Sequence, residues 1–599
     1  MSDNPLIQDR TVEFVLHDTL RVMQLTELPR FADHDRQTLD LFVAGCRRFA
    51  RSVLFPTYKP MDEHAAYYEN GRVHCHPILK SLYPQLTELG LLRATRDFEA
   101  GGQQLPAPIL MTALAYLSAA NLSAIGYMSL TMGAAHLLES FGSETVKRTY
   151  MDPMLAGQWT GTMALTEPNA GSGLTDLSTK AVPTAGGHYL LSGSKVFISG
   201  GDNDFSENIV HLALARIEGA PPGIKGISLF CVPRLRASDG ELRDNDCTTA
   251  GTFHKLGFRG LPSIALNFGE RGDCHGYLVG APNQGITCMF QMMNEARIGV
   301  GMTGMATAMV AYEQALQYAK DRPQGRRFGM RSHEPPVPII EHADVKRMLL
   351  RQKAICEGAF ALLVRCSKYA DLSTHSPDEA VRKRAHTLLE LLTPVAKTFP
   401  AEKGFESNAL AMQVHGGYGY TSEYLPEAWL RDQKLNSLHE GTTGIQSLDL
   451  LGRKVLQTQG QSLLTFAEEL ELTLSRAAAA GVEGSLGDGL RGAMDALQRA
   501  STAVGAVAMN GDIGRALQNS ADYLDLFSTL VIGWSWLELA AAAKEQLAGS
   551  IPADARPFYE GKLRAARYWF SNEMPRIRVL ADIIVEADDA FFGAEAAHL

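Results

Sequence analysis

A central stretch of short alternating runs, flanked on both sides by long helical patterns, constrains the fold more than any other feature of this sequence. Between about residues 158 and 285, apolar and polar side chains alternate in runs such as 188–201 (HYLLSGSKVFISGG), with many Gly, Pro, Asn and Asp residues between them. Such alternation is typical of half-buried strands joined by turns. We therefore predict a small antiparallel β-sandwich or barrel over 158–287.

Helical periodicity dominates on either side of this stretch. Residues before about 155 contain amphipathic patterns such as that of 79–89, in which apolar side chains recur every three to four positions. After residue 288 the periodicity predicts three long helices, over about 289–320, 340–371 and 377–414, whose apolar faces imply a bundle.

A chain of 599 residues is long enough for about three or four domains. A Gly- and Ala-rich linker around Ala477 to Gly492 is predicted to separate off a last helical piece. The predicted fold class is α+β, mainly α. We expect an N-terminal helical domain (1–157), a middle β domain (158–287), a helical bundle (288–460) and an extra C-terminal helical domain (461–599).

One apolar segment could be mistaken for a membrane span. Residues 101–138 contain no Asp, Glu, Lys or Arg, but Pro106, Gly126 and His136 interrupt the run. We expect two buried helices there and no transmembrane segment. The first residues carry early acidic side chains and no apolar core, so we expect no signal peptide.

Cysteine usage and charge limit the class of protein. The 8 cysteines form no CxxC pair, which favours reduced thiols in a cytoplasmic protein. His74-Cys75-His76 lacks a second ligand pair, and we expect no metal site. The net charge is -10, and 461–599 holds 19 acidic against 11 basic residues, a net of -8. We expect no nucleic-acid partner, because binding phosphates needs clustered Lys and Arg.

Glu440 is the strongest candidate for a functional side chain. It stands directly before Gly-Thr-Thr-Gly (441–444), and two glycines within four residues disfavour a helix and favour a turn. A carboxylate in a turn between two helices can point into a cleft. The alternative is an ordinary surface glutamate, since charged side chains are mostly exposed.

Two motifs in the β stretch have the chemistry of a ligand site. The run 163–173 (MALTEPNAGSG) is a Gly-rich turn with hydroxyls and backbone N–H groups, which suits a phosphate or the polar edge of a flat ring. The run 195–201 (KVFISGG) puts an aromatic side chain and a hydroxyl on one strand face. Each motif could instead be an ordinary loop or a half-buried strand.

Taken together, these motifs resemble those of the acyl-CoA dehydrogenase family. The LTEPxAGS turn, the KxFIS strand, Asn294-Glu295-Ala296-Arg297 taken as a helix start, QVHGG at 413–417 and Glu440-Gly441-Thr442 occur in the family's order and approximate spacing over about 40–455. The length and the extra C-terminal helices are similar to a long bacterial branch, which includes enzymes assigned to methylthio-substituted propionyl-CoA.

The resemblance implies FAD held between the β domain and the helical bundle. The Thr166 hydroxyl would lie near flavin N5, and Gly171 and Ser172 would face the flavin pyrophosphate or the pantetheine arm. Phe197 stands where many relatives have Trp, so the indole N–H is missing. The implied flavin contacts are Met163, Leu165, Thr166, Gly171, Ser172, Phe197 and Ser199, with Thr442 from the helical bundle.

A second group is implied to reach the FAD of a neighbouring subunit, through charge-assisted and backbone contacts. This group consists of Arg322, Gln324, Gln413, Gly416 and Gly417. The resemblance therefore implies a homo-oligomer, a dimer or a tetramer, with the dimer favoured.

Removing an α-proton from a thioester requires a positioned base and stabilisation of the developing enolate oxygen. By resemblance Glu440 is the base, and its backbone N–H holds the thioester carbonyl; burial should raise its pKa. Some relatives carry the base at the position of Ala296. Glu295 is one residue away from that position, about a third of a helical turn, so we favour Glu440.

The substrate contacts implied by the resemblance are Ser172, Asn294, Arg297 and Gly441. Arg297 would order the site, and Asn294 would bond pantetheine, although each could merely cap or brace a helix. Gly444 stands where relatives often have Gln, so one flavin contact is missing.

The leading hypothesis is FAD-dependent dehydrogenation of a fatty acyl-CoA to the trans-2-enoyl-CoA, the first step of β-oxidation, with electrons passed to an electron-transferring flavoprotein. The sequence does not separate this enzyme from an oxidase of the same fold that uses O2. A DNA-binding flavoprotein of the alkylation-response type would need a basic C-terminal domain. A flavin-free scaffold is the third alternative, and the acyl chain length stays open.

Overall fold

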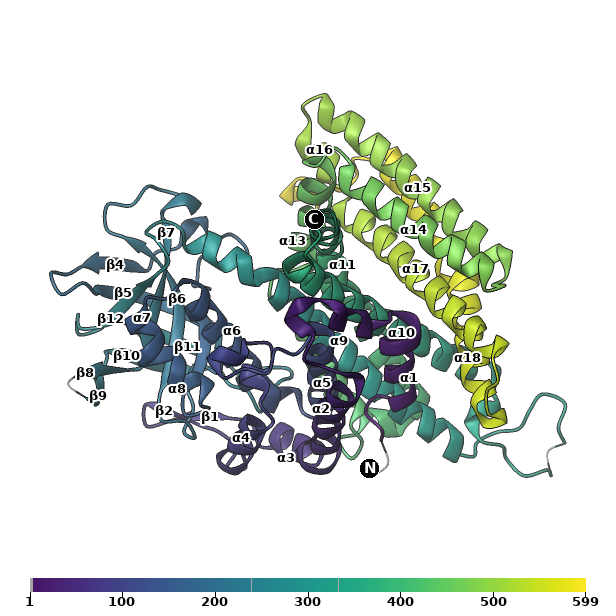
Figure 1. The fold of residues 1–599 in the computed structure, drawn as a ribbon, viewed down its shortest axis with the longest axis horizontal. Coiled ribbons are helices and arrows are strands. Elements are labelled where there is room, and N and C mark those ends of the chain that lie inside the picture. The colour runs from purple at the N-terminus through teal and green to yellow at the C-terminus, as the bar shows by residue number, and fades with distance from the viewer. Residues whose placement is uncertain (1–3, 239, 332) are drawn as a thin grey trace. The chain divides into compact units, whose positions relative to one another are not determined.

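The protein is mainly helical with one block of strands, so the predicted α+β class is confirmed (Figure 1). The computed structural model describes residues 4–238, 240–331 and 333–599, without the side chains of 290–292. Contacts divide the chain into two compact units. Unit 1 comprises 1–41, 106–119 and 297–599, and unit 2 comprises 42–105 and 120–296.

The strands of unit 2 form an 8-stranded sheet that closes on itself. β5 pairs with β12, β12 with β7, β7 with β6, and β6 with β4, which returns to β5, so the predicted barrel is confirmed. The pairing is not purely antiparallel as predicted, because β6 runs parallel to both β3 and β4. The strands are β3 (Thr160–Ala164), β4 (Lys180–Pro183), β5 (Tyr189–Ser199), β6 (Ile209–Ile217), β7 (Ile227–Pro233), β10 (Cys247–Thr252), β11 (Ser263–Phe268) and β12 (His275–Val279).

A bulge in β5 sets which side chains face the barrel core. The pairing of β5 with β11 shifts register between Ile198 and Lys195, and Phe197 in this interval has a left-handed φ of 60°. An extra residue in one strand reverses the alternation of side chains. Lys195 is therefore fully buried, while Phe197 two residues later is exposed.

Helices cover this sheet, and two small hairpins accompany it. α6 packs on β3, and its N-terminus is capped by Asn121, whose side chain accepts a hydrogen bond from the Ala124 N–H. The hairpin of β1 (Tyr67–Glu69) and β2 (Arg72–His74) lies in the region predicted to be wholly helical, and β8 (Leu235–Ser238) pairs with β9 (Glu241–Asp244). The helices of the N-terminal region are α1 (Asp9–Glu13), α2 (Arg36–Phe49), α3 (Tyr58–Glu63), α4 (Leu79–Glu88), α5 (Ala107–Ala120), α6 (Leu122–Phe141), α7 (Glu144–Val146) and α8 (Asp152–Leu155).

The three long helices predicted after the β stretch are present. They are α9 (Gly285–Asp321), α10 (Ala343–His375) and α11 (Glu379–His415), followed by the short helices α12 (Pro426–Leu435) and α13 (Thr443–Leu448). α9 begins nine residues before Asn294, so Asn294 and Arg297 lie inside a helix and cannot cap one.

Within unit 1, α9 and α11 cross at glycines. A Cβ on Gly301 would lie 1.9 Å from the Ala396 carbonyl oxygen, and a Cβ on Gly304 would lie 3.0 Å from that of Pro400. Only glycine allows the two backbones to approach this closely. The crossing buries the α11 side chains around Ala396.

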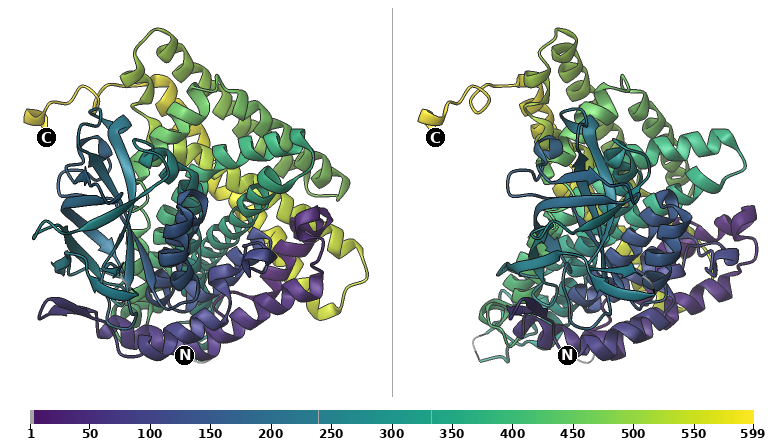
Figure 2. Two further views of the ribbon diagram at one scale, coloured as in Figure 1. Left: turned by 60° about the vertical axis from the view of Figure 1, so that its left-hand side comes forward. Right: turned by 90° about the vertical axis from the view of Figure 1, so that its left-hand side faces the viewer.

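The C-terminal helices pack on one another and on α10 and α11. Figure 1 shows α14, α15 and α17 running side by side, and Figure 2 shows the chain leaving the helices after α19. The predicted linker at 477–492 is wrong, because only residues 480–483 separate two helices there. The elements are α14 (Gln461–Ala479), α15 (Gly484–Met509), α16 (Ile513–Leu517), α17 (Ser520–Ala548), α18 (Arg556–Tyr568) and α19 (Arg576–Glu586).

α17 is the central helix of this C-terminal part. Trp534 and Trp536 are both fully buried, and the Trp536 indole N–H donates to the Ala354 carbonyl of α10 over 2.9 Å. Gly358 of α10 leaves room for this indole, since a Cβ there would lie 3.0 Å from Nε1. The extra helices therefore complete the core around α10.

The apolar segment 101–138 forms two largely buried helices, α5 and α6, as predicted. Within the described residues, the single stretch long and apolar enough to cross a membrane is Ile513–Ala548, and 94% of its most apolar window is buried inside the protein. Burial of this kind is typical of the core helix of a globular domain.

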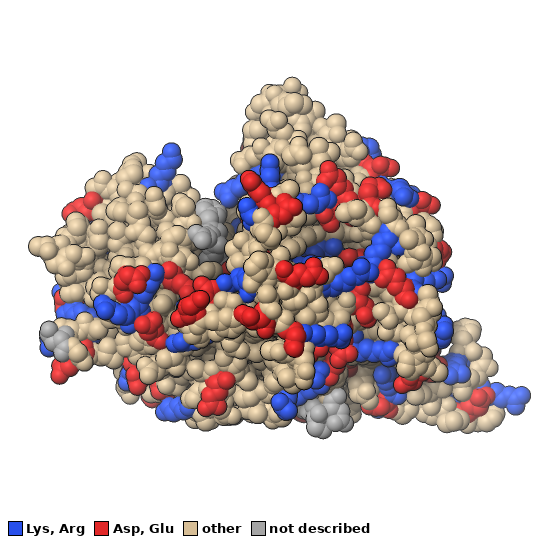
Figure 3. Space-filling model, viewed as in Figure 1, with Lys and Arg blue, Asp and Glu red and all other residues tan. Residues whose placement is uncertain are grey.

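Within the described part of the chain no metal cluster stands out, and charges of both signs mix on the face that Figure 3 draws. No group of three or more His, Cys, Asp or Glu side chains there could hold a metal ion. The ring of His74 instead stacks on Tyr67, with centroids 5.1 Å apart. On the face drawn in Figure 3, blue Lys and Arg side chains are interspersed with red Asp and Glu.

Candidate active site

Glu440 lies in a turn between α12 and α13, as predicted, and its backbone has a left-handed φ of 53°. Gly441 follows with a φ of 87°. Thr442 then caps α13 by accepting a hydrogen bond from the Ile445 N–H. Non-glycine residues with positive φ are uncommon and cluster at functional sites, because the surrounding structure must hold them there.

Gln446 holds this turn, and sequence reasoning missed it. Its side chain is fully buried and donates to the Glu440 carbonyl over 3.0 Å. A Cβ on Gly441 would lie 2.7 Å from the same amide nitrogen, so residue 441 must be glycine for the bond to form. As a residue Glu440 is accessible to solvent, although protein atoms around its carboxylate partly desolvate it.

Two cations act on the Glu440 carboxylate. Desolvation raises its pKa above the ordinary value for a glutamate, and the charges of Arg297 and Lys397 oppose that rise. Arg297 is itself buried and pairs with Asp449, with Nη1 and Oδ2 2.6 Å apart. Asp449 and Lys397 were not predicted, since only the packing of α9, α11 and the α13 region brings them near the turn.

Glu295, the competing candidate base, is paired on the surface of unit 2. Its carboxylate lies 3.0 Å from Nδ1 of His136 on α6, and its side chain is 62% exposed. The hydrogen bond to Glu295 raises the pKa of His136. Glu295 therefore already has a histidine partner in a solvated setting. Asn294, the predicted pantetheine contact, is partly buried on α9 next to it.

In unit 2 the structure brings the two predicted flavin motifs together. The Val196 N–H donates to the Thr166 carbonyl over 2.9 Å, and Nζ of Lys195 donates to the Leu165 carbonyl over 3.3 Å. The Phe197 ring is 61% exposed and lies 4.6 Å from the ring of Phe253. Met163, Leu165, Thr166 and Ser199 are partly buried, and Gly171 and Ser172 are exposed in the turn.

A buried ion pair fixes the shape of this turn. Glu167 lies 2.8 Å from Nζ of Lys195, and its carboxylate also accepts hydrogen bonds from the backbone and hydroxyls of Ser178 and Thr179. Although desolvation raises the Glu167 pKa, Lys195 and the hydroxyls hold it at about 2. Lys195 has a pKa lowered to about 8 by desolvation.

We expect Lys195→Met to destabilise the barrel and to weaken retention of the flavin that the resemblance implies. Removing one partner leaves the Glu167 charge buried without its cation, which costs about 3–5 kcal/mol. Thermal unfolding and the flavin content after gel filtration measure the two effects. Lys180→Met on the neighbouring strand β4, where the lysine is exposed, is the control and should change neither. Equal melting temperatures for wild type and Lys195→Met would contradict the role of the pair.

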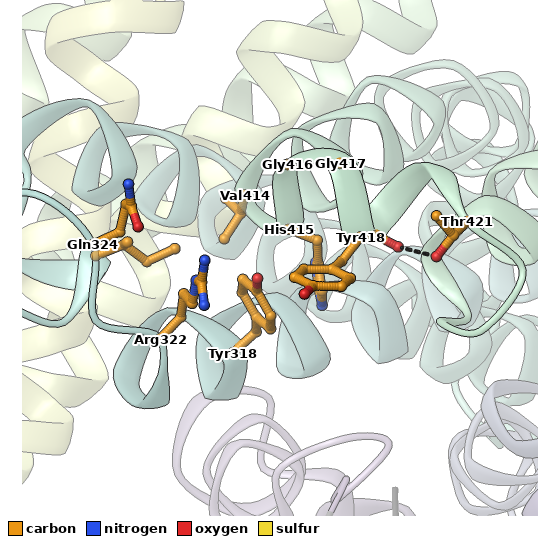
Figure 4. A pocket seen from close by; sticks show the side chains of 10 residues that line it. Tyr318, Arg322, Gln324, Val414, His415, Gly416, Gly417, Tyr418 and Thr421 are labelled. Carbon is orange, nitrogen blue, oxygen red and sulfur yellow. Dashed lines mark hydrogen bonds between the residues drawn. The ribbon is translucent and has the colours of Figure 1, made fainter.

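A cavity of about 430 Å³ in unit 1 brings together four of the five residues expected to meet a second subunit's cofactor (Figure 4). They are Arg322, Gln324, Gly416 and Gly417. Gln413 is exposed on α11 but does not line this cavity. The lining residues not predicted are Tyr318, Ile339, Val414, His415, Tyr418 and Thr421.

The cavity has an aromatic wall and a charged rim. The His415 ring stacks on Tyr318 with centroids 4.4 Å apart, and the Arg322 guanidinium lies 6.0 Å from the centroid of the Tyr418 ring. A Cβ on Gly416 or Gly417 would meet no atom within 4 Å, so their backbone is open to a ligand. An arginine, aromatic faces and glycine backbone that no side chain covers suit an anionic, ring-bearing ligand.

Family models match most of the chain. Those described as the N-terminal, middle and C-terminal domains of acyl-CoA dehydrogenase match residues 36–158, 162–270 and 283–456. A fourth, described as acetyl-CoA dehydrogenase C-terminal like, matches 466–595. The likeness therefore extends over the C-terminal helices.

Individual proteins match over the same length. The 3-methylmercaptopropionyl-CoA dehydrogenase of Ruegeria pomeroyi is 37% identical over 93% of this chain and 94% of its own. The broad-specificity linear acyl-CoA dehydrogenase FadE5 of Mycobacterium tuberculosis is 32% identical over 97% of this chain and 98% of its own. The acyl-CoA dehydrogenase of Bacillus anthracis complexed with FAD has the same fold, with a TM-score of 0.70, 20% identity, and coverage of 94% of this chain and 90% of that one.

Proposed function

Since this chain belongs to the acyl-CoA dehydrogenase family and is an oxidoreductase of that class, we propose that it uses FAD to convert a fatty acyl-CoA to the trans-2-enoyl-CoA, with Glu440 as the base. The observation that carries this proposal is the strained turn of Glu440. Gln446 fixes the backbone of this turn, and the Glu440 carboxylate has a raised pKa and lies within the fields of Arg297 and Lys397. Such a carboxylate is suited to accept a proton from carbon.

Two groups of residues fit FAD. The exposed Phe197 of unit 2, on the strand that bonds the turn at Leu165 and Thr166, offers an aromatic face to a flat ring. The cavity around Arg322, Gly416 and Gly417 in unit 1 offers a cation and open backbone. When bound, FAD supplies the acceptor for the hydride that leaves the β-carbon.

The chain's own residues would act on the thioester. The Glu440 carboxylate takes the α-proton, and the Glu440 backbone N–H binds the carbonyl oxygen, on which negative charge develops. Arg297, fixed by Asp449, orders the site. The coenzyme A arm would contact Ser172, Asn294 and Gly441.

Assembly, partner and location are part of the same proposal. The cavity in unit 1 is open and suits an anionic cofactor, which supports its binding the FAD of a second copy in a homodimer. The residues that would contact that FAD are Arg322, Gln324, Gln413, Gly416 and Gly417. Electrons would pass to an electron-transferring flavoprotein, and the enzyme would serve β-oxidation in the cytoplasm.

An anaerobic flavin-bleaching screen tests the proposal. Short, medium, long, branched and methylthio-substituted acyl-CoA esters are mixed with the purified yellow protein, and loss of the flavin absorption band is followed. We expect bleaching by linear or methylthio-substituted esters, the substrates named for the two relatives above. No bleaching with any ester would overturn the proposal, and rapid oxygen-dependent peroxide release would identify an oxidase instead. The acidic C-terminal part and the mixed charges of Figure 3 weigh against the DNA-binding alternative.

A further inference from the structure

Lys397 on α11 is a buried cation without a hydrogen-bond partner. Its side chain is fully buried, and within the described residues its ammonium group makes no hydrogen bond. A buried charge without a partner is strongly unfavourable, so such groups are rare away from functional sites. Arg297, the other cation that acts on Glu440, has its own carboxylate partner in Asp449.

The helix crossing explains why Lys397 is where it is. Lys397 follows Ala396, whose carbonyl meets α9 at Gly301, and Arg297 stands one helical turn before Gly301. The close approach of the two backbones therefore buries Lys397 and brings it to within about one helical turn of the level of Arg297.

The charged groups that act on Lys397 come from three elements. They are Glu402 on α11, Glu440 in the turn before α13, and Arg297 on α9. Glu402 is also bonded by the Thr443 hydroxyl, which lies three residues after Glu440. Lys397, Glu402 and Arg297 thus all act near the Glu440 turn, and Lys397 is the one among them whose charged group makes no hydrogen bond within the described residues.

We propose that Lys397 is a positioning residue for the Glu440 base: its unpartnered buried ammonium keeps the Glu440 carboxylate ionised before substrate binds. This inference rests on the proposed function, because it assigns Lys397 a role in proton abstraction. The ammonium lowers the free energy of the carboxylate relative to the protonated acid. It therefore extends the pH range in which Glu440 can accept a proton, while making Glu440 a slightly weaker base.

The proposal predicts a crossing of pH profiles. In Lys397→Met the lower pKa of flavin reduction by acyl-CoA should rise by about one unit, giving a rate about tenfold lower than wild type on the acid limb. At pH values above the Glu440 pKa and below about 8, where wild-type Lys397 is still charged, the variant should be as fast as wild type or faster, because its carboxylate is more basic. A purely structural role would lower the rate at every pH.

Lys397→Arg separates charge from shape. Desolvation lowers the Lys397 pKa to about 8, so the wild-type ammonium is lost as pH rises through that value. Arginine stays charged, so Lys397→Arg should keep the wild-type acid limb and lose any inflection near pH 8. Lys403→Met is the matched control on the same helix, because Lys403 pairs with Glu406 and Asp525 and not with Glu440; its profile should be unchanged.

A second readout does not depend on turnover. The infrared carbonyl band of protonated Glu440 is identified as the band that Glu440→Gln removes, and its titration gives the Glu440 pKa directly. A higher Glu440 pKa in Lys397→Met than in wild type supports the inference, and Lys397→Gln replaces the Met variant if that variant does not fold. This readout stands even if no acyl-CoA bleaches the flavin. Absence of bleaching would defeat only the proposed function. The inference would be overturned if acyl-CoA bleaches the flavin of both proteins while wild type and Lys397→Met have the same infrared pKa for Glu440 and parallel pH–rate profiles.

Discussion

Glu440→Gln is expected to keep its flavin and to lose flavin bleaching by acyl-CoA by at least about a thousandfold, the size of a general-base contribution. The amide has the shape of the carboxylate and leaves the bond from Gln446 to the Glu440 carbonyl intact. It cannot accept a proton from carbon. Stopped-flow absorbance at the flavin band, under saturating substrate and without oxygen, measures the loss.

Glu295→Gln is the matched control, because it makes the same chemical change on the exposed carboxylate that pairs with His136. Its bleaching rate should stay close to wild type. The reverse pattern, a fast Glu440→Gln and a slow Glu295→Gln, would place the base on α9 and refute the assignment of Glu440.

Removing residues 461–599 is expected to leave an insoluble or unfolded chain. Figures 1 and 2 show the C-terminal helices lying along the earlier helices of unit 1, where α17 packs against both α10 and α11. The truncation removes the buried Trp534 and Trp536 side chains from the core. Loss of a single buried Trp lowers the free energy of unfolding by about 3–5 kcal/mol. Total stabilities are only about 5–15 kcal/mol, so a few such losses exceed the whole.

Charge pairing adds to this effect. Lys562 of α18 is fully buried, lies 2.9 Å from the Glu357 carboxylate of α10, and donates to the Thr11 hydroxyl of α1. Without α18, the fully buried Glu357 would keep Lys353 as its single cationic partner within the described residues. The extra helices therefore stabilise the bundle rather than merely covering it.

Soluble yield, gel filtration and thermal unfolding test the truncation. Deletion of 589–599 alone is the control, because these residues follow α19 and are almost all exposed; it should change none of the three. A soluble, yellow, well-folded 1–460 fragment would contradict the structural role of the C-terminal helices.

Much of the architecture was predictable because it depends on local patterns. Alternation and helical periodicity predicted the barrel and the three long helices, and two glycines predicted the Glu440 turn. The linker predicted near Ala477 is wrong because a Gly- and Ala-rich composition does not by itself end a helix. Tertiary packing overrides the weak preference of glycine against a helix, and α15 runs through four glycines between Gly484 and Gly492.

What the sequence by itself determined is the order of elements and the type of residue in each motif, since both follow from spacing along one chain. Only the tertiary structure decided that the β5 bulge turns Lys195 inward and Phe197 outward, that Asp449 holds Arg297, and that Lys397 is buried beside the Glu440 turn. The physical reason is that these contacts join residues far apart in the sequence. Register and helix crossing set them, and neither leaves a periodic trace in the chain.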